Sequence, residues 1–227
     1  MIAGILLAAG RSRRFGSQKL LIPYTSGLTL FEHVLRVYLC AGIDPLVVVV
    51  SREIMGRFFR GEVPQPSSFR IDSVGSAPWM RLHTPWGRAR LMVNRYPERG
   101  MSTSLTLGLR GLEESERRKG VLVSLADMPK VTPALVQTLA GIYQRKSADM
   151  VVPTYRGQTG HPVIFREPRY RQAIKNIRGD KGLRDIIRSN KGKIVYVPWP
   201  DDAVVTDVDT TSDLNRIFQQ GVMMDGN

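Results

Sequence analysis

The residues that could do chemistry begin with a glycine-containing segment near the amino end. It runs from Leu7 to Lys19 and reads LAAGRSRRFGSQK. Its small residues let backbone amides approach phosphate oxygens, and Gly10 and Gly16 permit unusual backbone dihedral angles. Arg14 and Lys19 add positive charge suited to a polyanion. We interpret the segment as a triphosphate-binding loop; the alternative is an ordinary βα turn with exposed basic residues.

The spacing within this segment excludes two known phosphate-binding motifs. It is not a Walker A loop, because Lys19 does not directly follow Gly16. It also lacks the Gly-x-Gly-x-x-Gly pattern, which removes the main support for a dinucleotide cofactor.

Two acidic positions each follow an apolar run. Asp127 comes directly after residues 121–126, and Asp209 lies in the segment DVDT at residues 207–210. Ligands collect at the carboxyl ends of parallel strands, so we expect Asp127 to face the glycine segment. Carboxylates there can hold magnesium. Asp127 could instead only form a turn before Pro129, and Asp209 or its neighbour Thr210 could instead only cap a helix.

Two later segments place polar groups among glycines, GQTGHP at 157–162 and GDKGLR at 179–184. Of the three histidines, only His161 has such a setting. We expect it to shape a pocket rather than to transfer protons, because a single histidine is more often structural than catalytic.

The apolar runs predict the fold that must position these residues. Runs rich in Val, Ile and Leu alternate with amphipathic stretches, which is typical of βαβ units and a mainly parallel sheet. The runs are continuously apolar, so we expect helices on both faces. Strands are predicted at 2–8, 46–50, 91–94, 121–126, 150–153, 162–165, 194–197 and 204–208, and helices at 28–41, 133–145 and 212–220.

One domain is predicted over residues 1–227, with an insertion at 61–90. The insertion is proline-rich, has little periodicity, and contains Trp79 and Trp86. We interpret it as a surface excursion whose tryptophans pack locally, in preference to a lid or a subunit contact.

The composition bounds the class of protein. No apolar run approaches the roughly 20 residues of a membrane-spanning helix, and the single cysteine, Cys40, excludes an internal disulfide. We therefore expect a soluble, cytoplasmic protein. The net charge of +13 suits nucleic acid, anionic lipid or a polyphosphate ligand, so a basic nucleic-acid-binding or regulatory module is the alternative of another class. No aromatic stacking platform or named nucleic-acid motif supports it.

In order and approximate spacing, these motifs resemble the molybdenum cofactor cytidylyltransferases, within the wider group of molybdopterin-guanine-dinucleotide-synthase-like NTP transferases. The resemblance covers most of the chain outside the insertion, and it lies in residues 7–19, 94–105, 127–129, 160–162, 179–182 and 207–210. Ala9 is similar to the cytidylyl branch, since guanylyl relatives usually have a second glycine there. The departures concern the acceptor side: the insertion is long, Leu183 stands where a small residue is common, and Thr211 replaces a usual proline.

The resemblance implies an α/β fold, a Rossmann-like three-layer sandwich of the nucleotide-diphospho-sugar-transferase type with a mainly parallel sheet. It implies transfer of CMP from CTP to a phosphorylated acceptor such as molybdopterin, with magnesium as cofactor and release of pyrophosphate. A guanylyltransferase or a sugar-phosphate nucleotidyltransferase is the alternative within this chemistry. A molybdoenzyme or its chaperone is a further partner, whereas neither a membrane nor a nucleic acid is expected.

Site residues follow by the same analogy. The implied catalytic residues are Arg14, Lys19 and Asp127, and the implied metal ligands are Asp127 and Asp209. The implied nucleotide-binding residues are Leu7, Ala8, Ala9, Gly10, Arg14, Lys19, Gly100 and Ser104, and the implied acceptor-binding residues are Gly160, His161, Asp180 and Arg184.

Overall fold

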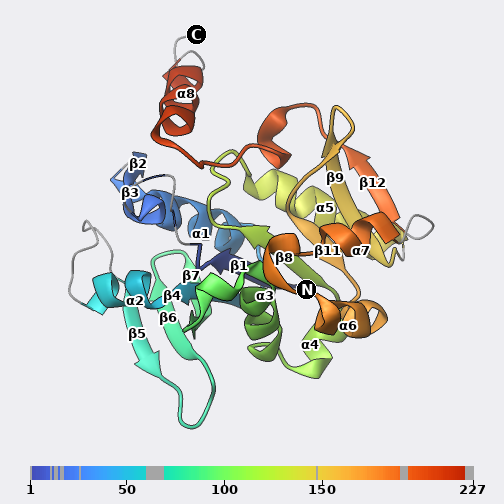
Figure 1. The fold of residues 1–227 in the computed structure, drawn as a ribbon, viewed down its shortest axis with the longest axis horizontal. Helices are drawn as coiled ribbons and strands as arrows, with labels where there is room; N and C mark the ends of the chain where they lie inside the picture. The colour runs from blue at the N-terminus through green and yellow to red at the C-terminus, as the bar shows by residue number, and fades with distance from the viewer. Residues whose placement is uncertain are drawn as a thin grey trace.

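A ten-stranded sheet with helices on both faces forms the centre of the protein in the computed structural model (Figure 1). The structure describes residues 2–10, 12, 15, 18–25, 27–59, 69–146, 148–189 and 194–222. Arg14 and Gly16 of the predicted phosphate-binding segment lie outside the described residues, as do positions 61–68 of the predicted insertion.

The sheet is parallel at its centre and mainly antiparallel towards its edges, where only the pair of β12 with β9 is parallel among the described strands. Its strands lie in the order β10 (Gln158–Thr159), β9 (Met150–Tyr155), β11 (Val163–Phe165), β8 (Val121–Leu125), β1 (Ala3–Ala8), β4 (Leu46–Ser51), β7 (Gly87–Asn94), β6 (Met80–Thr84) and β5 (Arg70–Ser73), and β12 (Ile194–Pro198) also pairs with β9. The pairs of β8 with β1, β1 with β4 and β4 with β7 are parallel. The α/β fold class is therefore confirmed.

Alternate residues of the central strands pack into two apolar layers. Leu6 of β1 faces one layer, which includes side chains of α1 (Leu30–Cys40), α2 (Arg52–Phe59), α5 (Pro133–Lys146) and α8 (Thr211–Val222). Ile5 faces the other, which includes α3 (Met101–Arg110), α6 (Glu167–Asn176) and α7 (Arg184–Ser189), with α4 (Glu114–Arg118) beside α6. Because both faces are covered, these strands contain almost only apolar residues.

Local capping accounts for where α1 begins and ends. The Thr29 side chain accepts a hydrogen bond from the Glu32 backbone, and the Glu32 carboxylate accepts one from the Thr29 backbone. This reciprocal pair satisfies amides at the start of the helix. After the helix Gly42 adopts a φ of 79°, which favours glycine. The short hairpin of β2 (Pro23–Thr25) and β3 (Leu28–Thr29) precedes α1.

The predicted strand at 204–208 is wrong. Residues 202–204 form a 3-10 turn and the chain continues without regular structure to Thr210. The Val204 carbonyl accepts a hydrogen bond from the His161 backbone, and the Val208 backbone donates to the Asp127 carbonyl. Val204 and Val208 are both fully buried although they do not belong to a strand. Their apolar side chains therefore gave the same sequence pattern as a buried strand.

Residues 69–90 extend the sheet at one edge. β5, β6 and the first half of β7 pair as an antiparallel ribbon, and β7 begins before the predicted strand at 91–94. Trp86 packs edge-on against Phe69, with ring centroids 5.9 Å apart. No helix in the described parts of the chain is long and apolar enough to cross a bilayer.

Candidate functional site

A cavity of about 690 Å³ opens at the carboxyl ends of β1 and β8. Many of the residues singled out in the sequence line it, namely Leu7, Ala9, Gly10, Lys19, Gly100, Ser104, Asp127, Asp180 and Asp209. These residues come from five separate segments of the chain, 7–19, 100–104, 127, 180 and 209. The cavity is therefore a product of the fold and not of one motif.

Lys19 is the one cationic side chain among the described residues that line this cavity, and its side chain is only 8% exposed. Its Nζ lies 2.8 Å from Asp127 Oδ2 and 3.1 Å from Asp209 Oδ1, and it also donates a hydrogen bond to the Val208 carbonyl. Burial alone would lower the pKa of Lys19, but Asp127 and Asp209 outweigh it, so the pKa is raised above its ordinary value. Lys19 is therefore held as an ammonium between two carboxylates.

Backbone hydrogen bonds explain why Asp127 and Asp209 meet at this place. β8 lies beside β1 in parallel register, and the Ala126 backbone donates to the Leu7 carbonyl at 3.0 Å. The Val208 backbone in turn donates to the Asp127 carbonyl at 2.9 Å. Asp127 lies in a turn, as its alternative interpretation required, but its carboxylate also contacts Lys19.

The residues before α8 answer a second question from the sequence, whether Asp209 or Thr210 only caps a helix. Thr210 caps α8, because its hydroxyl accepts a hydrogen bond from the Asp213 backbone and its own backbone N–H donates one to the Asp213 carboxylate. Asp209 has a different role, since its carboxylate contacts Lys19. Capping and the charged site thus use neighbouring residues.

The described part of the glycine segment folds back so that both of its ends reach the cavity. Ser12 donates to Gln18 Oε1 at 2.9 Å and accepts from the Lys19 backbone at 3.2 Å. Ser12 has a φ of 46°, an unusual value for a residue other than glycine. Gln18 is buried and also donates to Glu53 of α2 at 3.4 Å. These contacts position Lys19 opposite the end of β8.

The start of α3 forms the other side of the cavity. Gly100 has a φ of 94°, and a Cβ there would lie 2.3 Å from the carbonyl carbon of Gly179. Only glycine allows the two backbones to approach this closely. Asn94, at the end of β7, donates to Ser104 Oγ at 2.9 Å. Asp180 accepts a hydrogen bond from the Met101 backbone at 3.0 Å, so its carboxylate caps α3 while it lines the cavity.

Four of the predicted residues that the structure describes do not line this cavity. Ala8 points into the core on the opposite face of β1 from Leu7. Gly160 and His161 lie against the loop at Val204, where a Cβ on Gly160 would approach the Val204 carbonyl oxygen to 2.0 Å. Arg184, at the start of α7, is exposed.

His161 is nevertheless near the charged site. Burial is the largest influence and lowers the pKa of its imidazole, while a hydrogen bond with the Val123 backbone and the charge of Asp127 act in the opposite sense. Its Nδ1 is buried and has no partner within the part of the chain that the structure describes. The environment favours a neutral ring.

The prediction missed several lining residues, of which Asp207 is the most relevant. Desolvation, followed by the charges of Asp127 and Asp209, raises the pKa of its carboxyl. The same DVDT segment that pointed to Asp209 was the available signal. Ser12, within the predicted phosphate-binding segment, and Glu98 also line the cavity, but neither side chain was singled out as a site residue.

The acidic residues suit a divalent metal that takes only one or two ligands from the protein. Asp127 Oδ1 is buried and lacks a hydrogen-bond partner among the described residues, whereas Asp127 Oδ2 contacts Lys19. Within that same set of residues, no cluster of three or more His, Cys, Asp or Glu side chains is arranged to hold a metal. Magnesium commonly binds to one or two carboxylates and completes its shell with water and substrate phosphates. Asp127 and Asp209 match that donor set.

Known proteins match this chain along nearly its whole length. Residues 4–194 match the MobA-like NTP transferase domain. The chain is 26% identical over 219 residues to purine catabolism protein PucB of Bacillus subtilis, covering 95% of each protein. It is 25% identical over 221 residues to a probable molybdenum cofactor guanylyltransferase of Mycobacterium avium, covering 96% of this chain and 95% of that protein.

Solved structures agree with this match. The crystal structure of Rv0371c from Mycobacterium tuberculosis superposes with a TM-score of 0.73 at 25% identity, covering 96% of this chain and 98% of that one. A second structure of Rv0371c is a complex with manganese, with a TM-score of 0.69 at 23% identity, covering 96% of this chain and 98% of that one.

Proposed function

The chain belongs to the family of MobA-like NTP transferases, and from this premise we propose that it transfers CMP from CTP to a phosphorylated acceptor and releases pyrophosphate. The single observation that supports this most is the contact of buried Lys19 with Asp127 and Asp209. A cation shared by two carboxylates at the carboxyl edge of a parallel sheet is suited to metal-bound triphosphate. The cavity of about 690 Å³ also falls within the usual range for small-molecule sites, roughly 300–1,000 Å³.

Each side of the cavity has a distinct part in this proposal. The backbone around Ala9 and Gly10 binds the phosphates, and the Lys19 ammonium offsets their negative charge. The base lies towards Gly100 and Ser104, where Asn94 orients the Ser104 hydroxyl. Asp180 keeps α3 in position through the Met101 backbone.

Asp127 and Asp209 are the residues that would hold a divalent metal. A metal bound to them would neutralise charge on the triphosphate as pyrophosphate departs. The remaining contribution comes from the chain itself: Lys19 links the two carboxylates to each other, so their separation is set before substrate arrives.

The reaction needs no strong general base. One oxygen of the acceptor phosphate attacks the α-phosphorus of CTP and forms a new P–O bond. The bond from the α-phosphorus to the bridging oxygen breaks, and its electron pair leaves with pyrophosphate. The acceptor phosphate is already ionised near neutral pH, since its second pKa is about 6. Positioning and charge neutralisation then supply the catalysis.

Ala9 supports CTP over GTP, and molybdopterin is the proposed acceptor. The similarity to a probable molybdenum cofactor guanylyltransferase keeps GTP as the second candidate. The cytoplasm as location, and a molybdoenzyme or its chaperone as partner, belong to the same proposal.

The test is a panel of pyrophosphate-release assays. CTP, GTP and UTP are each combined with molybdopterin or a sugar phosphate, with magnesium present. We expect release with CTP and molybdopterin, and a loss of about 100-fold or more in Asp127→Asn. Asp202→Asn is the matched control, because Asp202 pairs with Lys130 outside the cavity and should retain wild-type turnover. Faster release with GTP would refute the CTP assignment, and no release with any pair would refute nucleotidyl transfer.

A further inference from the structure

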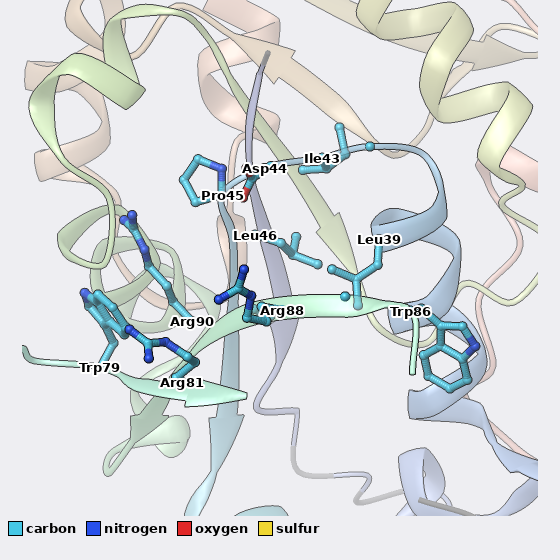
Figure 2. Close-up of a pocket in the computed structure, with 13 residues that line it drawn as sticks. Leu39, Ile43, Asp44, Pro45, Leu46, Trp79, Arg81, Trp86, Arg88 and Arg90 are labelled. Atoms are coloured by element: carbon cyan, nitrogen blue, oxygen red, sulfur yellow. The ribbon is translucent and has the colours of Figure 1, made fainter. Parts of the chain in front are cut away.

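A second hollow lies at the amino ends of β4 and β7, away from the carboxyl edge that carries the proposed active site (Figure 2). Its volume is about 400 Å³, and none of its lining residues lines the Lys19 cavity. It is lined by three arginines, two tryptophans and apolar residues before β4. This combination of charges and aromatic rings has no part in the proposed transfer reaction.

The three arginines come from neighbouring strands and share one face of the sheet. Arg81 of β6 is the direct cross-strand partner of Arg90 of β7, and Arg88 lies two residues before Arg90. Figure 2 shows Arg88 and Arg90 between the indole of Trp79 and Leu46 in this view. Like charges placed directly opposite one another destabilise a sheet unless they are neutralised.

Arg90 is the member of this group that the protein neutralises itself. Its guanidinium donates to both carboxylate oxygens of Glu116, at 2.8 and 2.7 Å, and to the Gly111 carbonyl at 2.9 Å. It also lies 5.0 Å from the ring centroid of Trp79. Arg90 is therefore held in place by Glu116 and Gly111, and its guanidinium lies over the Trp79 indole.

Arg81 and Arg88 lack such a partner. Asp72 is the cross-strand partner of Arg81, but its carboxylate contacts Arg70 at 3.1 Å and His83 at 2.9 Å. Within the described stretches of the chain, neither Arg81 nor Arg88 forms an ion pair, and Asp44 is the one acidic residue that lines the hollow. The hollow thus retains two guanidinium groups for an external anion.

We propose that this hollow binds a small phosphomonoester with an apolar or aromatic body. Arginine forks match phosphate oxygens, which supplies the recognition of the dianion. Trp79, Leu39 and Pro45 line the hollow and are only partly buried, so they offer apolar surface for the body of the ligand. A second copy of the chain is disfavoured as the occupant, because each copy has a net charge of +13 and this face is basic. The inference does not depend on the proposed transfer reaction.

The experiment is calorimetric titration of the full chain with phenyl phosphate. Phenol tests the ring without the anion, and inorganic phosphate tests the anion without the ring. We expect phenyl phosphate to bind more tightly than either. Arg81→Gln and Arg88→Gln should each weaken binding about tenfold, the loss of one charge-assisted pair. Arg88→Lys should lie between Arg88→Gln and wild type, because lysine keeps the charge but not the fork.

Two controls separate this site from other anion sites. Arg145→Gln removes the same charge from the exposed end of α5 and should leave binding unchanged. Because the Lys19 cavity is itself proposed to bind phosphates, each titration is repeated in Lys19→Met, where the loss on Arg81→Gln or Arg88→Gln should remain about tenfold.

Three results would overturn the proposal. One is no binding at about 10 mM phenyl phosphate, which would mean a free energy of binding weaker than roughly 3 kcal/mol. Another is equal binding by Arg81→Gln, Arg88→Gln and wild type when circular dichroism shows all three to be folded. The third is a short glutamate peptide that binds at these arginines when phenyl phosphate does not.

Discussion

Replacing Lys19 with methionine removes the cation that Asp127 and Asp209 share, while it keeps a side chain of similar length. In the wild-type protein the ammonium lies 2.8 Å from Asp127 and 3.1 Å from Asp209. Without it, two carboxylates face each other across the cavity with Asp207 nearby. We expect the variant to be less stable than wild type in the absence of metal.

The size of the loss follows from burial. Lys19 is 8% exposed, Asp127 21% and Asp209 39%, so the pair with Asp127 is largely buried and the pair with Asp209 is partly screened. Breaking a fully buried pair costs about 3–5 kcal/mol, whereas an exposed pair contributes about 0–1 kcal/mol. We therefore expect Lys19→Met to lower the free energy of unfolding by about 2–3 kcal/mol.

The assay is urea denaturation at pH 7.5 with a chelator present. Lys130→Met is the control, because Lys130 contacts Asp202 at 2.9 Å and that pair is 21% and 41% exposed. The control should lose only about 0.5–1 kcal/mol. Equal losses in Lys19→Met and Lys130→Met would refute the reasoning, since burial of the Lys19 cluster would then have no energetic effect.

Adding magnesium or manganese gives the same prediction a second readout. A divalent cation can replace the missing ammonium between Asp127 and Asp209, so it should stabilise Lys19→Met more than it stabilises wild type. At 100 times its dissociation constant, a bound metal adds about 2.7 kcal/mol. A metal that stabilises both proteins equally would argue against Asp127 and Asp209 as its ligands.

Two further predictions concern the structure around the site. Gly100→Ala should destabilise the protein by about 1–3 kcal/mol more than Gly27→Ala, because a Cβ on Gly100 would collide with Gly179 whereas one on Gly27 meets nothing within 4 Å, although both residues have positive φ; similar melting temperatures for the two variants would contradict this. Burial lowers the pKa of His33 in the folded protein. Below about pH 6.5 the unfolded chain therefore binds a proton that the native state does not, and the free energy of unfolding decreases as the pH is lowered. His33→Gln should therefore show a smaller drop in urea midpoint between pH 8 and pH 5.5 than wild type, and an unchanged drop would exclude His33 as a source of acid sensitivity.

The sequence by itself determined the central sheet and the location of the reactive edge. Continuous apolar runs predict buried parallel strands, because a strand covered by helices on both faces has no side chain that faces water. The run before Asp127 became β8, beside β1, as that pattern requires. Residues that follow such strands must share one edge, which is why the glycine segment and Asp127 lie at the same rim.

Only the tertiary structure decided which of these residues touch. Lys19 and Asp209 are separated by most of the chain, and their contact depends on a loop that was predicted as a strand. The close approach of Gly100 to Gly179 and the use of Asp180 as a helix cap are equally non-local. Local sequence patterns report burial and backbone preference, whereas the partner of a charged side chain is set by loops that pack over the sheet edge.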